Sequence, residues 1–165
     1  MMAEQHVQKS ANVFTKKGFH ELEEKLDYYI SVRRNEIAEQ IAVARGFGDL
    51  SENAEYDEAK KEQAALESKI VELENAIRTA IVIDDEDITT DKVSVGTLVR
   101  IRDMETGDEE EYSIVGGRES DPDTNRISNE SPMGAALLGA KKGDQVTVDA
   151  PAGALKFTVL DIRRQ

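Results

Sequence analysis

Apolar residues recur at helical spacing through the first half of the chain. Between residues 15 and 45 their gaps are threes, fours and one seven, which places them on one stripe of a helix: Phe19, Leu22, Leu26, Ile30, Ile37, Ile41 and Ala44. Thr15 is a suitable N-cap, and Gly46 and Gly48 supply the permissive backbone expected just past a helix C-terminus. The pattern therefore predicts a helix from about Thr15 to Arg45.

A second helical pattern follows almost at once. Its apolar positions repeat with gaps of seven, four, three and four, which is coiled-coil spacing: Ala59, Leu66, Ile70, Leu73 and Ile77. Each predicted helix has about 30 residues and is about 45 Å long, and the short connection requires an antiparallel return. We therefore expect a helical hairpin over residues 14–83, with charged outer faces and an exposed tip at residues 46–53.

The pattern changes to alternation after residue 83. "DDEDITTD" predicts an acidic linker over residues 84–92, and the segments in 93–165 alternate with period two. One β-hairpin is predicted around "ETGD" and another around "PAGA", and a short helix should start at Pro132 after Ser131 as N-cap. The fold class is therefore α+β, a long antiparallel α-helical coiled-coil hairpin followed by a small antiparallel β-sheet with one helix. Residues 1–13 are expected to form a flexible leader.

Composition limits the function classes. With 34 acidic against 21 basic residues and a formal charge of −13, the chain repels a bare phosphate backbone, so a protein partner would have to recruit any nucleic acid. The absence of cysteine excludes a disulfide, a thiolate zinc site and a thiol nucleophile. His6 and His20 are too far apart to suggest a metal site. No signal peptide or membrane span is visible, so a soluble cytoplasmic protein with no membrane partner is expected.

The predicted tip carries two acids three residues apart, in "ARGFGDLSENAEYDEAK". Asp49 and Glu52 form a D-x-x-E pattern, which at a helix start is a capping-box arrangement with Asp49 as N-cap. On spacing alone this structural interpretation has the stronger claim. The alternative is that the two exposed carboxylates hold a hard divalent cation. Two carboxylates alone bind Mg²⁺ weakly, so such a site would be completed only by ligands from elsewhere.

Two blocks of sequence resemble the bacterial transcript-cleavage factors of the Gre family. One is "GDLSENAEY", preceded by "SVRRNEIAEQIAVAR", and the other is "ISNESPMGAALLGAKKGDQVTV", and they lie in the expected order in different predicted domains. The resemblance runs from Phe14 to Arg163. It implies that the hairpin enters the secondary channel of a backtracked RNA polymerase and stimulates endonucleolytic cleavage of the nascent RNA 3′ end. The chain would then be no enzyme by itself, because the polymerase cuts its own transcript.

The resemblance also implies roles at the tip. Asp49 and Glu52 fall on the family's two acidic positions, which hold a second, weakly bound Mg²⁺ in the complex and orient the attacking water, in a two-metal pattern. Arg45 and Lys60 match basic positions that face extruded RNA. Without the family, an ordinary solvated charge is an equally good interpretation of either residue.

Asn53 and Tyr56 belong to the same motif as support for the tip. The favoured interpretations are a hydrogen bond at the helix start for Asn53 and packing against the opposite helix for Tyr56. By resemblance the C-terminal domain is FKBP-like, similar in fold to a prolyl isomerase, and docks at the rim of the polymerase channel; a shared fold implies no isomerase activity. A monomer is expected.

Two other functions stay open. A related channel-binding protein would inhibit the polymerase without cutting, although an altered tip would be expected there and "GFGDLSEN" keeps both acids. A coiled-coil scaffold or chaperone module would explain the heptads but leave the tip acids and the second block unexplained. One departure from the family is visible, since Gly46 and Phe47 stand where more polar residues are expected.

Overall fold

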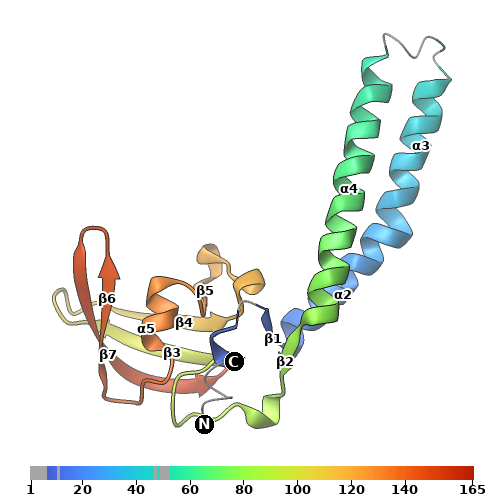
Figure 1. Ribbon diagram of the computed structural model, residues 1–165. Coiled ribbons are helices and arrows are strands. Elements are labelled where there is room, and N and C mark those ends of the chain that lie inside the picture. The colour runs from blue at the N-terminus through green and yellow to red at the C-terminus, as the bar shows by residue number, and fades with distance from the viewer. Residues whose placement is uncertain (1–6, 11, 47, 49–52) are drawn as a thin grey trace. The chain divides into compact units, whose positions relative to one another are not determined.

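The chain divides into two compact units. The computed structural model describes residues 7–10, 12–46, 48 and 53–165. One unit, here called the sheet unit, combines Met1–Phe19 with Ala80–Gln165, and the other, the hairpin unit, is His20–Thr79. The hairpin is therefore an insertion in the sequence of the sheet unit, as the colours along the ribbon show (Figure 1).

The first predicted helix has the expected start and end. Helix α2 (Lys16–Tyr28), a π-helix η1 (Tyr29–Arg33) and α3 (Arg34–Arg45) follow one another, and α4 (Ala54–Thr79) returns antiparallel to them (Figure 1). The Thr15 hydroxyl accepts a hydrogen bond from the Gly18 N–H at 3.1 Å, which confirms the predicted N-cap. The π-helical segment was not predicted.

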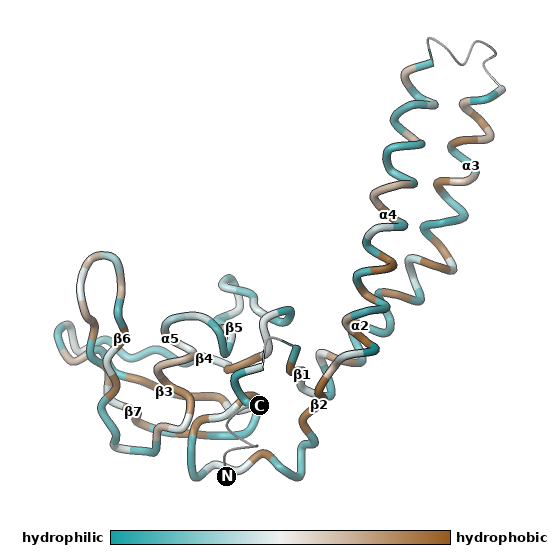
Figure 2. Tube along the Cα trace, in the orientation of Figure 1, coloured by the Kyte–Doolittle hydropathy of each residue, from teal (hydrophilic) through white to brown (hydrophobic). Residues whose placement is uncertain are grey.

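A narrow apolar seam joins the two sides of the hairpin. Its buried residues are Ile37, Ile41, Ala59, Leu66 and Ile70. Leu26, Tyr29 and Tyr56 are partly buried against them, and Figure 2 shows brown seam positions alternating with teal along α3 and α4. The prediction that Ile30 belongs to the seam was wrong, because its side chain is 37% exposed and Tyr29 packs there instead. A π-helical turn contains more residues than an α-helical turn, so the side chains of Tyr29–Arg33 point in other directions than the α-helical period of 3.6 predicts.

The second predicted helix ends earlier than expected. Helix α4 stops at Thr79, and Ile81–Ile83 forms strand β2, which pairs in parallel with β1 (Val13–Thr15). Three consecutive β-branched residues favour a strand when a partner is available. The boundary of the hairpin therefore lies inside the predicted range of 14–83.

The sheet unit contains a five-stranded sheet in the order β5-β4-β3-β7-β6. Its strands are β3 (Thr97–Asp103), β4 (Glu109–Val115), β5 (Arg126–Ser128), β6 (Gln145–Ala150) and β7 (Gly153–Arg164). Both predicted β-hairpins are confirmed, with Val99 opposite Tyr112 and Ala150 opposite Gly153.

The sheet is not purely antiparallel, which corrects the prediction. Strand β5 runs parallel to β4 because the chain between them crosses over through two short 3-10 helices, η3 (Gly117–Glu119) and η4 (Pro122–Thr124), instead of a tight turn. Helix α5 (Pro132–Leu137) begins as predicted, and the Ser131 hydroxyl accepts from the Gly134 N–H at 3.0 Å.

The core of the sheet unit includes residues from segments that were predicted to lie outside any domain. Val13 is completely buried, Val7 packs on the core, and Ile88, from the predicted linker, is buried next to the 3-10 helix η2 (Asp85–Asp87). The Asn129 side-chain amide donates to the carbonyls of Gln8 at 2.7 Å and Ser10 at 3.0 Å. In its described residues the leader is therefore part of the sheet unit, because scattered apolar side chains and one buried amide hold it there. No described helix is long and apolar enough to cross a membrane.

Candidate functional site

The two predicted catalytic acids lie outside the described residues. Asp49 and Glu52 are in the stretch 49–52, and Phe47 is likewise not described. Helix α3 ends at Arg45, and Gly48 has a left-handed φ of +98°, which favours glycine. The described frame of the candidate site is thus the last turn of α3 and the first turn of α4.

Asn53 connects the two helix ends that frame the tip. Its side-chain Oδ1 accepts a hydrogen bond from the Tyr56 N–H at 3.1 Å, which is N-cap geometry for α4. Its Nδ2 donates to the Ala44 carbonyl at 2.6 Å, in the last turn of α3, where the carbonyls have no following helical turn to bond. The Asn53 side chain therefore links the end of α3 to the start of α4 and caps the first turn of α4. The predicted capping box with Asp49 as N-cap lies outside the described residues.

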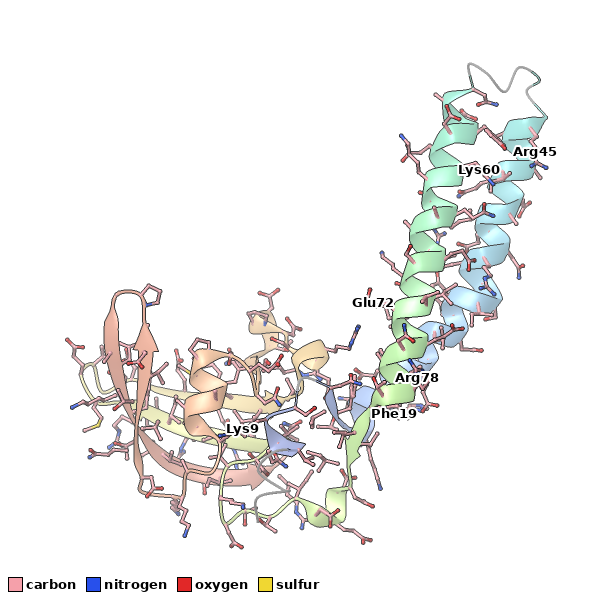
Figure 3. All side chains as sticks on the ribbon, in the orientation of Figure 1. Lys9, Phe19, Arg45, Lys60, Glu72 and Arg78 are labelled. Carbon is pink, nitrogen blue, oxygen red and sulfur yellow. The ribbon has the colours of Figure 1, made fainter. Side chains whose placement is uncertain are left out.

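Arg45 and Tyr56 meet beside Asn53. The Arg45 guanidinium carbon lies 5.9 Å from the centre of the Tyr56 ring, within cation–π range, and Tyr56 packs on the seam. Lys60 lies one turn further along α4 and contacts Gln63, with 3.0 Å between Nζ and Oε1. Figure 3 labels Arg45 and Lys60 near the tip end of their helices. Within the described part of the hairpin, neither cation forms an ion pair.

Arg34 extends this side of the hairpin away from the tip. It precedes Arg45 by eleven residues, or three helical turns, so both lie on the same side of α3. Its Nε and Nη2 contact Glu67 Oε1 and Oε2 at 2.8 and 2.9 Å, and Glu67 is two turns beyond Lys60 on α4. We call Arg34, Arg45 and Lys60 the basic row.

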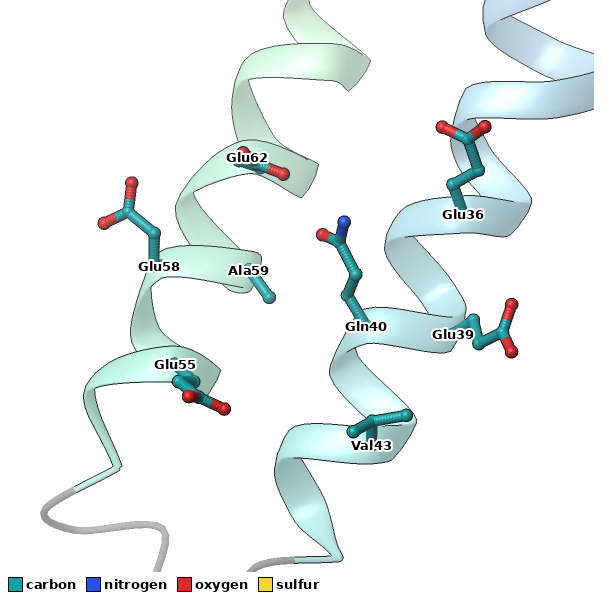
Figure 4. A pocket seen from close by; sticks show the side chains of 8 residues that line it. All are labelled: Glu36, Glu39, Gln40, Val43, Glu55, Glu58, Ala59 and Glu62. Atoms are coloured by element: carbon teal, nitrogen blue, oxygen red, sulfur yellow. The ribbon is translucent and has the colours of Figure 1, made fainter.

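The opposite side of the hairpin is an acidic groove. It is lined by Glu36, Glu39, Gln40, Val43, Glu55, Glu58, Ala59 and Glu62 (Figure 4). Arg33 stands at its end, paired with Glu36 and 3.9 Å from Glu62. Sequence analysis missed this groove, although the spacing of three and four between its acids was a visible signal. The hairpin therefore carries the basic row on one side of its seam and a cluster of carboxylates on the other.

The described residues hold no preformed metal site. Among them, no three or more His, Cys, Asp or Glu side chains are grouped so as to bind an ion, and His20 pairs with Glu24 at 3.1 Å. Carboxylate oxygens suit Mg²⁺ by their chemistry. The assignment of Asp49 and Glu52 as its ligands stays a prediction.

Three known proteins are similar to this chain. The chain is 51% identical over 153 residues to transcription elongation factor GreA of Clostridium perfringens strain 13, covering 93% of this chain and 97% of that protein. It is 53% identical over 152 residues to GreA of Thermoanaerobacter pseudethanolicus, with 92% and 97% covered. Among solved structures, GreA factor homolog 1 of Thermus thermophilus is 28% identical over 92% of this chain and 97% of that one, with a TM-score of 0.41.

Two family models together account for nearly the whole chain. The N-terminal domain of transcription elongation factors matches residues 12–82, and the C-terminal domain of GreA/GreB transcription elongation factors matches residues 88–164. The first match spans the helical hairpin with β1 and the first two residues of β2, and the second spans the five-stranded sheet. The chain therefore belongs to the GreA/GreB family of transcription elongation factors.

Proposed function

We propose that this elongation factor inserts its helical hairpin into the secondary channel of RNA polymerase and stimulates cleavage of the 3′ end of backtracked nascent RNA. The observation that carries the proposal is the acidic pair Asp49 and Glu52 in a short connection whose two helix ends are joined by Asn53. A cap at Asn53 leaves the two acids without a necessary role in starting α4. We therefore assign their carboxylates to chemistry at the tip of the hairpin.

The chemistry follows from what two carboxylates can do. Asp49 and Glu52 would supply oxygen ligands to a Mg²⁺ ion shared with the polymerase, and they can accept a hydrogen bond from the attacking water. When bound, such an ion would lower the pKa of that water and stabilise the negative charge on the reacting phosphate. Two carboxylates are too few to hold Mg²⁺ tightly, so the ion would be retained only in the complex. The protein itself is thus no nuclease, and the polymerase cuts its own transcript.

Charge on the hairpin supports an orientation toward RNA. The acidic groove repels a phosphate backbone, whereas Arg45 and Lys60 lie on the other side without an ion pair among the described residues. Because the whole chain carries a charge of −13, RNA alone would not hold it. Recruitment would fall to contacts between the polymerase and the sheet unit.

The test is a cleavage assay on a stalled, backtracked elongation complex with labelled RNA. We expect rapid shortening from the 3′ end with the wild-type protein, and rates lower by orders of magnitude with Asp49→Asn or Glu52→Gln at unchanged polymerase binding. Glu58→Gln makes the same charge change in the acidic groove and should cleave like the wild type. Equal loss of binding and cleavage in the tip variants would refute the catalytic assignment.

The same assay separates the alternative function. A regulator that occupies the channel without cutting would bind the backtracked complex and leave its RNA at full length. The apolar Phe47 beside the acidic pair is the feature that favours this alternative, since it could alter the fit of the tip without removing an acid.

A further inference from the structure

We propose that Glu67 limits the grip of the basic row on RNA by occupying Arg34. This inference rests on the proposed function, because it takes extruded single-stranded RNA as the polyanion that the row contacts. It adds an element that the cleavage chemistry does not require, a carboxylate that withholds one of three cations from the RNA.

The three cations lie in order along one side of the hairpin. Arg45 is at the tip end, beside Tyr56, and Lys60 follows one turn along α4. Arg34 lies further from the tip, about 16 Å from Arg45 along the helix axis at 1.5 Å per residue. The row is long enough to follow more than one phosphate of a single strand. At the end of the row away from the tip, Glu67 binds Arg34.

The contact between Arg34 and Glu67 is bidentate. Two parallel N–H groups of the guanidinium meet the two carboxylate oxygens at 2.8 and 2.9 Å, the paired geometry that also suits a phosphate. The hydrogen bond from Arg34 lowers the pKa of the Glu67 carboxyl, so Glu67 stays ionised at neutral pH. At that pH the pair presents no net charge, and the Nε–Nη2 edge of the guanidinium, which would suit a phosphate, is already used by Glu67.

The pair is nevertheless within reach of RNA. The side chains of Arg34 and Glu67 are 42% and 46% exposed, so neither is shielded by the seam. By contrast, Arg45 and Lys60 have no carboxylate partner among the described residues. Removing the charge of Glu67 would therefore leave none of the three cations of the basic row in an ion pair with a described residue.

A purely structural role is the competing explanation. The pair links α3 to α4, and exposed ion pairs of this kind contribute little to stability. If cross-linking the helices were its whole purpose, Glu67→Gln would alter thermal stability slightly and leave the response of RNA contacts to salt unchanged. Salt dependence therefore discriminates the two roles, because each phosphate contact releases counterions.

The experiment compares the affinity of the protein for backtracked and non-backtracked elongation complexes over a series of KCl concentrations. Only the backtracked complex has extruded RNA, so the difference isolates the RNA contribution. The matched control is Glu62→Gln, which makes the same charge change on the same helix but in the acidic groove. Arg34→Gln, alone and combined with Glu67→Gln, completes a double-mutant cycle.

We expect Glu67→Gln to raise affinity for the backtracked complex alone, by about two- to fivefold. The slope of log affinity against log salt should steepen by about 0.7, the value for one added phosphate contact on a single strand. Glu62→Gln should change neither quantity, and adding Arg34→Gln to Glu67→Gln should remove the gain.

The outcomes for the inference and for the proposed function are distinct. Wild-type protein that neither binds nor cleaves the backtracked complex would refute the proposed function and the inference with it. Wild-type cleavage combined with an unchanged salt slope for Glu67→Gln would refute only the inference. Equal gains for Glu67→Gln and Glu62→Gln would do the same, since they would show a response to net charge.

Discussion

The sheet unit and the hairpin unit bury their apolar side chains in different ways. In the sheet unit, Val95, Val99 and Leu137 are completely buried. Their core is covered by the strands, by α5, and by the segments just before and just after the hairpin in the sequence. In the hairpin unit a seam one side chain wide is shared by two helices, and most other positions face water. The sheet unit is therefore constrained throughout, whereas the hairpin can vary its surface chemistry at little cost to its fold. Charge is distributed accordingly, with a basic row and an acidic groove on two sides of the same seam.

The largest expected loss of stability comes from truncating a buried side chain, and it should differ between the core of the sheet unit and the seam of the hairpin unit. Ile101→Ala, at a side chain 1% exposed, should lower the unfolding free energy of the sheet unit by about 3 to 4 kcal/mol. Ile70→Ala, 2% exposed in the seam, should cost about 2 to 3 kcal/mol, because helices open to water on both sides can close part of the cavity. Amide hydrogen exchange should show lost protection in β3 and β7 for the first variant and in α3 and α4 for the second. Loss of protection in β3 after Ile70→Ala would show that the two units unfold together, contrary to the comparison.

A smaller effect is expected where the hairpin is closed at its tip. Asn53→Ala removes both the cap on α4 and the bond to Ala44, and should lower the local stability of the hairpin by about 1 kcal/mol. Asn53→Asp keeps an acceptor for the Tyr56 N–H but cannot donate to the Ala44 carbonyl. It should therefore retain amide protection in the first turn of α4.

Cleavage assays on these two variants sharpen the assignment of Asn53. If the bridge to Ala44 positions the acidic pair, Asn53→Asp should cleave several-fold more slowly than the wild type while its first turn stays protected. Wild-type cleavage by Asn53→Asp would leave Asn53 with the capping role alone.

The smallest effect concerns an exposed ion pair of the sheet unit. Lys16 Nζ lies 2.8 Å from Asp84 Oδ1, and this hydrogen bond lowers the pKa of the Asp84 carboxyl and raises that of the Lys16 amine. A carboxyl with a lowered pKa stabilises the fold above its unfolded pKa of about 3.9, and the stabilisation is lost as the pH falls through the folded pKa. Asp84→Asn should thus slightly lower the melting temperature at neutral pH and lessen its fall in acid.

The control for this pH dependence is Asp91→Asn, which removes an exposed acid from the same segment. Its melting temperature should follow the wild type down the acid limb. If the melting temperatures of the wild type and Asp84→Asn fell equally as the pH was lowered, a role for the Lys16 contact would be contradicted.

Local signals made much of the fold predictable. The caps at Thr15 and Ser131 and the two β-hairpins depend on residues a few positions apart, and all were confirmed. Strand β2 was missed because Ile81–Ile83 continues the helical period, and its partner strand lies some 68 residues earlier in the chain. The leader was missed for the same reason, since its anchor Asn129 is 121 residues from Gln8. Such pairings carry no local pattern.

The candidate site was predictable to a different extent. A short motif singled out Arg45 and Asn53, but the bond from Asn53 to Ala44 depends on how two helices meet across the turn. The pairing of Arg34 with Glu67 likewise depends on the register of the seam between the two helices. The roles of Asp49 and Glu52 come from family resemblance and charge chemistry, and remain predictions.

Because β1 pairs in parallel with β2, the helical hairpin between them could be replaced by another hairpin. Register places Val13 opposite Ile81, so the chain leaves at Thr15 and returns at Ile81 about 8 Å away, from strand spacing and rise. The entry and exit points are set by the sheet unit whatever is inserted between them. Hairpins of other lengths, differing by whole heptads, could therefore be grafted between Phe19 and Ala80 without redesigning a linker, so the reach of such a protein can change over evolution while its other half stays the same.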